Sequence, residues 1–101
     1  MRSHLKEDLI LARQIILRSL ARYPVSVYLY GSTATGQRGR ASDIDVAVWS
    51  PQPLPPDTLA TIRQEIEESN IPYTVEVVNL QGADETFRER VLREGILWSA
   101  P

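Results

Sequence analysis

The sequence contains no cysteine and one histidine, and these gaps narrow the chemistry open to it. Without cysteine it has no disulfide, no thiol nucleophile and no cysteine-ligated zinc. The lone His4 cannot build a histidine-rich metal site. No stretch approaches the roughly 18–20 apolar residues of a membrane span, and no signal-peptide pattern opens the sequence. We therefore expect a cytoplasmic protein without membrane contact.

An excess of positive charge is also lacking. The sequence contains 11 lysines and arginines and 13 aspartates and glutamates, so the net charge is −2 at neutral pH. A protein with no basic excess has no global field for long nucleic acids, and we expect none as a partner. The 101 residues, 43% of them hydrophobic, fit one domain over residues 1–101.

Hydrophobic periodicity predicts a small α/β (α+β) unit in which one mixed β-sheet carries helices packed on one face. Proline and glycine punctuate the elements, and Asp57 and Asp84 stand at two expected helix starts. We expect helices over residues 5–23, 57–69 and 84–95, and strands over residues 25–30, 43–49, 73–80 and 96–98.

Alternation along the three main strands separates an apolar face from a face with carboxylates. If helices cover the valines and isoleucines, then Asp43, Asp45 and Glu76 emerge together on the opposite side. One interpretation is a solvated outer face. The other is a cation site, because like charges on one strand face repel unless a cation lies between them. Oxygen ligands suit Mg²⁺, and two such ions about 4 Å apart can clamp a phosphoryl displacement.

A Gly-Ser turn precedes the carboxylates. Gly31 ends the first strand, and residues 32–35 could start a short helix capped by Ser32. Backbone amides at such a turn form a positive concavity that suits phosphate. The alternative is a simple strand–turn–helix corner.

The residues GSTATGQRGRASDIDVAV, with ten residues between Gly31-Ser32 and Asp43-Ile-Asp45, resemble the signature of the DNA polymerase β-like nucleotidyltransferase superfamily. Within it, the chain is similar to minimal nucleotidyltransferase (MNT) domains, which are commonly encoded beside a HEPN-domain toxin. The resemblance covers nearly the whole chain and implies the polymerase β-like palm core.

By this resemblance, Asp43 and Asp45 would bind two Mg²⁺ ions, and Gly31 and Ser32 would hold the β- and γ-phosphates of a nucleoside triphosphate. Glu76 would be the third carboxylate, which completes the catalytic metal site and favours deprotonation of the attacking hydroxyl. It replaces the aspartate of the commoner pattern.

The resemblance also implies a function. The protein would transfer AMP from ATP to a hydroxyl, on a tyrosine of a cognate HEPN ribonuclease toxin, and so act as an antitoxin. A second hypothesis is a degenerate MNT domain that neutralises its partner by binding alone. A third, an antibiotic-modifying enzyme, is disfavoured because such proteins usually carry an additional helical domain.

Several other side chains have two interpretations. Arg38 and Arg40 could steady the triphosphate or be solvated loop charges. Tyr28 and Tyr30 share the carboxylate face, where an aromatic ring could stack on a base or simply pack, and Trp49 is equally ambiguous.

The first helix has more apolar residues than one core face needs. Ile10, Leu11, Ile15 and Leu17 lie off its main stripe. They could dock another chain, either a second copy or the HEPN partner. Alternatively, the sheet and the C-terminal helix could bury the helix on two sides.

Overall fold

The computed structural model describes residues 5–31, 44–71 and 74–100. Within them, four strands form one mixed sheet in the order β3-β2-β1-β4. Strand β1 is antiparallel to β2 and β4, whereas β2 and β3 are parallel. This confirms the predicted α+β class. The elements are α1 (Leu5–Ser19), β1 (Ser26–Tyr30), β2 (Ile44–Trp49), α3 (Thr58–Glu67), β3 (Val75–Asn79), the 3-10 turn η1 (Leu80–Gly82), α4 (Glu85–Glu94) and β4 (Ile96–Ser99).

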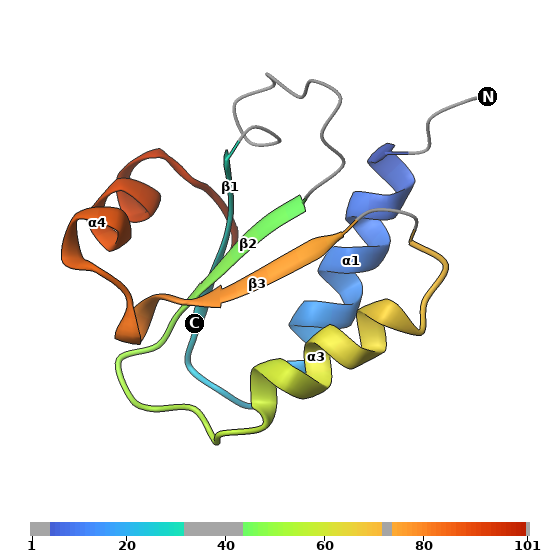
Figure 1. The fold of residues 1–101 in the computed structure, drawn as a ribbon, viewed down its shortest axis with the longest axis horizontal. Helices are drawn as coiled ribbons and strands as arrows, with labels where there is room; N and C mark the ends of the chain where they lie inside the picture. Colours follow the sequence, from blue (N-terminus) through green and yellow to red (C-terminus); the bar gives the residue numbers. More distant parts are fainter. Residues whose placement is uncertain (1–4, 32–43, 72–73, 101) are drawn as a thin grey trace.

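Helices α1 and α3 cover one face of the sheet and enclose the main core (Figure 1). Ile16 of α1 and Ile62 of α3 are fully buried there. The predicted alternation of the strands is confirmed, because the inward residues of each strand join this core. They are Val25, Val27 and Leu29, then Ile44, Val46 and Val48, and on β3 Val77 with the partly buried Val75.

Helix α4 packs against the opposite face of the sheet, separate from α1 and α3 (Figure 1). The predicted packing of the helices on one face of the sheet is thus correct for α1 and α3 but not for α4. Val91 of α4 and Ala47 of β2 form a second, smaller core with Leu80. The small side chain of Ala47 leaves room for the helix, and partly buried aromatic rings surround the contact. These rings belong to Tyr28, Tyr30, Trp49 and Phe87.

Helix α1 ends at Ser19, four residues earlier than the predicted end at Tyr23. The chain then tightens, with the Tyr23 amide donating to the Leu20 carbonyl at 3.0 Å, three residues back. Such turns commonly close a helix, and the residue before a proline is disfavoured in helical conformation. Pro24 therefore ends the helix indirectly, because it disfavours helical conformation in the residue that precedes it.

The two predicted helix starts differ in their capping bonds. The Asp84 carboxylate accepts hydrogen bonds from the amides of Thr86 and Phe87, at 3.1 and 3.3 Å. Asp57 occupies the same position before α3 but makes no side-chain capping bond. Its backbone, at φ −94° and ψ 1°, departs from the extended conformation usual for a capping residue.

The extra apolar residues of α1 are mostly used inside the molecule. Ile15 is buried, and Leu11 and Leu17 pack partly buried against the main core. The alternative of burial on two sides therefore holds, but the second side is covered by α3 and not by the C-terminal helix. Ile10 is 50% exposed. The extra apolar residues of α1 are therefore explained without a partner chain. None of the helices in the described ranges is long and apolar enough to cross a membrane.

Gly95, between α4 and β4, generates the first prediction. A Cβ at this position would lie 2.7 Å from the carbonyl oxygen of Val91 and 3.3 Å from that of Leu29. Both are backbone atoms of packed elements, so they cannot move freely. We expect Gly95→Ala to lower the free energy of unfolding by about 1–3 kcal/mol, the usual cost of overpacking. Urea denaturation measures it.

The matched control is Gly82→Ala, because a Cβ there would meet no atom within 4 Å. Its stability should stay within about 0.5 kcal/mol of the parent, as for most surface substitutions. Equal stability of the two variants would contradict the close approach at Gly95.

Candidate active site

Three polar residues form a row across neighbouring strands of the sheet. The register pairs Tyr30 of β1 with Asp45 of β2, and Asp45 with Glu76 of β3. Paired residues on adjacent strands, about 4.8 Å apart, point to the same face. The predicted placement of Glu76 on the same face as Asp45 is thereby confirmed. Asp45 is partly buried and Glu76 is exposed, so the row runs from the interior to the edge.

Gly31 follows Tyr30 and lies against the Asp45 carboxylate. Its φ is +79°, in the left-handed region that favours glycine. A Cβ added here would lie 2.5 Å from Oδ2 of Asp45, so any other residue would collide with the carboxylate. The bare backbone at residue 31 therefore makes room for Asp45, and the close approach expected of this glycine is to a neighbouring side chain.

The Tyr30 hydroxyl titrates above its ordinary range. Burial raises its pKa, and the negative charges of Asp45 and Glu76 raise it further. At neutral pH the phenol therefore keeps its proton and remains a hydrogen-bond donor. Its ring packs edge-to-face on Phe87 of α4, with ring centres 5.5 Å apart and planes at 79°. Packing is thus the observed role of Tyr30.

A cavity of about 330 Å³ adjoins Gly31, between the end of β1 and α4. It combines an aromatic and apolar wall with one guanidinium and one carboxylate. The Arg90 guanidinium stands over the Phe87 ring, with its carbon 5.8 Å from the ring centre. Sequence reasoning missed this wall, since no local signal places α4 beside β1. The lining residues are Tyr30, Gly31, Phe87, Arg90, Val91, Glu94 and Gly95.

The other sequence-predicted site residues, Ser32, Arg38, Arg40 and Asp43, lie outside the described residues. Among the residues that are described, no group of three or more histidine, aspartate or glutamate side chains could hold a metal ion. Asp45 and Glu76 supply two adjacent carboxylates, and oxygen donors of this kind fit a hard cation such as Mg²⁺. The described donors therefore fit part of the predicted metal site.

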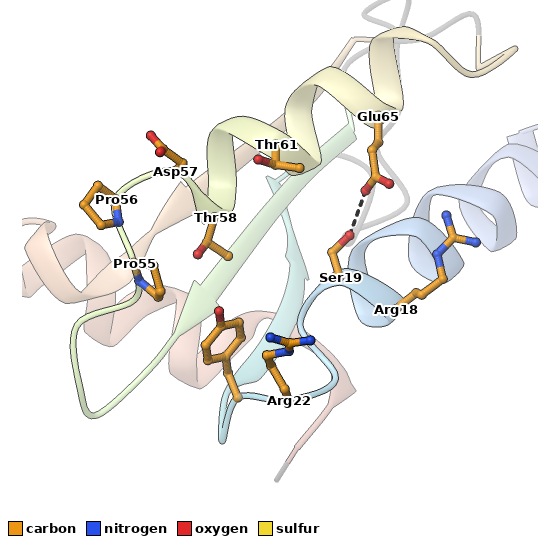
Figure 2. A pocket seen from close by; sticks show the side chains of 10 residues that line it. Arg18, Ser19, Arg22, Pro55, Pro56, Asp57, Thr58, Thr61 and Glu65 are labelled. Carbon is orange, nitrogen blue, oxygen red and sulfur yellow. Dashed lines mark hydrogen bonds between the residues drawn. The ribbon is translucent and has the colours of Figure 1, made fainter.

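A larger cavity, of about 450 Å³, lies elsewhere, where the end of α1 meets the start of α3 (Figure 2). Arg18 and Arg22 line it, and the Ser19 hydroxyl donates a hydrogen bond to the Glu65 carboxylate at 2.7 Å. These two helices cover the sheet face opposite the row of Tyr30, Asp45 and Glu76. The larger volume is therefore separate from the carboxylates.

Comparison with known proteins gives concordant matches. The family described as polymerase beta, nucleotidyltransferase matches residues 14–99. A relative from Haemophilus influenzae, named probable protein adenylyltransferase MntA, is 31% identical over 85 residues, which cover 82% of this chain and 71% of the relative.

Two solved structures are similar in fold as well as sequence. A minimal nucleotidyltransferase structure matches with a TM-score of 0.69 and 30% identity, covering 89% of this chain and 92% of the other. A toxin–antitoxin crystal structure with AMP-PNP matches with a TM-score of 0.68 and 25% identity, covering 88% of this chain and 73% of the other.

The charges around Tyr30 generate the second prediction. In metal-free buffer, Asp45→Asn should lower the Tyr30 pKa towards the ordinary tyrosine value of 10.0 without reaching it, because burial is the larger cause and persists. Phenolate absorbance, taken as the difference from a Tyr30→Phe background, measures the midpoint. Glu89→Gln, on the exposed side of α4, is the control. An unchanged midpoint in Asp45→Asn would contradict the proximity of the two side chains.

The same shift gives a pH dependence of stability. A pKa raised in the folded state stabilises the fold at pH below the unfolded value of 10.0, and this contribution is lost as pH rises through the folded pKa. Tyr30→Phe should therefore show a weaker decline of stability above pH 10 than the parent.

Proposed function

The chain belongs to the polymerase beta nucleotidyltransferase family, and from this premise we propose that it transfers AMP from ATP to a hydroxyl with two Mg²⁺ ions. The observation that carries the proposal is the register that sets Asp45 beside Glu76, with Gly31 against the Asp45 carboxylate. We also propose that residues 1–101 form one minimal nucleotidyltransferase domain.

In this proposal Asp43, Asp45 and Glu76 hold the two ions, while Gly31 and Ser32 bind the β- and γ-phosphates. When bound, the ions would neutralise phosphate charge and polarise the attacking and leaving oxygens. The acceptor hydroxyl would lie on the Glu76 side of the α-phosphorus, and its proton would pass to the Glu76 carboxylate. The hydroxyl oxygen bonds to the α-phosphorus, and the bond to the bridging oxygen breaks.

Pyrophosphate departs with the electron pair of the broken bond, and AMP remains on the acceptor oxygen. Arg38 and Arg40 follow the phosphate turn in the sequence, and we propose that they stabilise the negative charge of the departing pyrophosphate. Gly31 contributes by leaving space for the Asp45 carboxylate, which holds the metal ligands close to the phosphate turn.

We further propose that the acceptor is a tyrosine of a HEPN ribonuclease toxin, which makes the protein an antitoxin. The relative named as a protein adenylyltransferase supports a protein acceptor. The similar toxin–antitoxin structure with AMP-PNP supports both the nucleotide and a toxin partner. The sequence resemblance to MNT domains encoded beside HEPN proteins points the same way.

The alternative is neutralisation by binding alone, with Glu76 as a sign of lost catalysis. The geometry favours the enzyme, because Glu76 keeps the position directly beside Asp45 that a shared cation needs.

The third prediction tests transfer directly. The protein, incubated with labelled ATP, Mg²⁺ and its proposed HEPN partner, should label that partner on tyrosine. Asp45→Asn should abolish labelling while the protein stays folded, because the substitution relieves like-charge repulsion. Glu67→Gln, an exposed charge on α3, is the control and should label like the parent.

Labelling that persists in Asp45→Asn, or in excess chelator, would contradict the metal-dependent site. A parent that silences the toxin without any labelling would instead establish the binding-only alternative.

The fourth prediction concerns Glu76. Glu76→Gln keeps the shape but removes the charge, so transfer should slow by about 100-fold or more, in the range of general-base losses. ATP affinity should change much less, because the triphosphate is held by residues around Gly31. Glu76→Asp should recover part of the rate. Turnover and ATP binding, measured on the same preparations, separate the effects, and an unchanged rate in Glu76→Gln would remove it from the site.

A further inference from the structure

Helix α4 presents one guanidinium to the cavity beside Gly31. Among the described residues that line this cavity, Arg90 is the one with a positively charged side chain. The Arg90 side chain is exposed, and its guanidinium lies over the Phe87 ring, which packs edge-to-face on Tyr30. These contacts connect Arg90 to Tyr30, which precedes Gly31 and pairs with Asp45 in the register.

The cavity and Glu76 lie on opposite sides of Asp45. The strands run in the order β3-β2-β1-β4, so Glu76 is on the β3 side of Asp45. Gly31 ends β1, and Gly95, at the far wall of the cavity, leads into β4. A ligand that occupies both places must therefore pass over Asp45.

In-line displacement imposes the same order on the substrate. The attacking and leaving oxygens stand on opposite sides of the phosphorus that they exchange. If Glu76 favours deprotonation of the acceptor, the leaving pyrophosphate must lie on the opposite side, towards Gly31 and the cavity. This step rests on the proposed function, which places the α-phosphorus near Asp45.

We propose that Arg90 binds the β- and γ-phosphates of the nucleotide and stabilises the negative charge of the departing pyrophosphate. It forms no covalent bond. When the bond between the α-phosphorus and the bridging oxygen breaks, the electron pair goes to that oxygen, and the Arg90 N–H groups donate hydrogen bonds to the pyrophosphate. A planar guanidinium can donate two parallel bonds to a phosphate.

The carboxylate in the cavity has a different arginine as its ion-pair partner. Glu94 also lines the cavity, but its carboxylate pairs with Arg93, at 3.4 Å, on the exposed side of the helix. Arg90 instead contacts an uncharged ring, which leaves its N–H donors for a ligand. Phe87 is then a positioning residue for Arg90.

The test compares Arg90→Ala with Arg88→Ala. Arg88 is on the same helix and stacks on an aromatic ring, that of Trp49 at 5.5 Å, but it does not line the cavity. We measure affinity for Mg²⁺–ATP and for AMP by calorimetry. Arg90→Ala should weaken ATP binding about tenfold or more, as for loss of a charged hydrogen bond, and change AMP binding little. Arg88→Ala should bind both like the parent.

Phe87→Leu should weaken ATP binding by a smaller factor than Arg90→Ala and leave AMP binding unchanged, and Phe87→Tyr should restore it. A purely structural role would weaken both ligands together. Equal ATP affinity in Arg90→Ala and the parent, or an equal loss for ATP and AMP, would overturn the assignment.

The outcome is separable from that of the proposed function. If ATP binding depends on Arg90 but no AMP is transferred, the phosphate contact stands and the proposed reaction fails. If the parent transfers AMP and Arg90→Ala binds ATP equally well, the reaction stands and Arg90 is excluded.

Discussion

The register between β1, β2 and β3 is the constraint on which the site depends. It sets Tyr30, Asp45 and Glu76 side by side, through one antiparallel and one parallel pairing. A slip of one residue in any strand would turn its valines or isoleucines to the other face. Burial of Val46 and Val77 at the main core therefore fixes the position of the carboxylates as firmly as any contact between them.

How much of this could be predicted follows from the range of each signal. Strand alternation lies within a few residues, so the shared face of Asp45 and Glu76 was readable before the structure. The capping bonds of Asp84 are equally local. The contact between Tyr30 and Phe87 joins positions far apart in the chain, and no periodicity encodes it. The exact side of the sheet that α4 covers was therefore beyond the sequence.

The placement of α4 makes the two ends of the site unequal. At the β1 end, Tyr30 packs with Phe87 and Val91 of α4, and burial is the main cause of its raised pKa. At the β3 end, Glu76 is open to solvent. A small nucleotide can use the covered end, whereas a macromolecular acceptor needs the open one. This asymmetry agrees with the direction of transfer inferred from Glu76 and Arg90.

The extra methylene of glutamate at position 76 is compatible with that direction. Side chains on paired strand positions start from Cβ atoms about 4.5–5.5 Å apart. A shared Mg²⁺ needs ligand oxygens at about 2.0–2.1 Å, so two oxygens on opposite sides of the ion lie about 4 Å apart. Aspartate and glutamate both span this gap from adjacent strands. Glu76 is exposed at the edge of the sheet, so packing does not confine its longer side chain. The register, rather than the length of the side chain, places Glu76 beside Asp45.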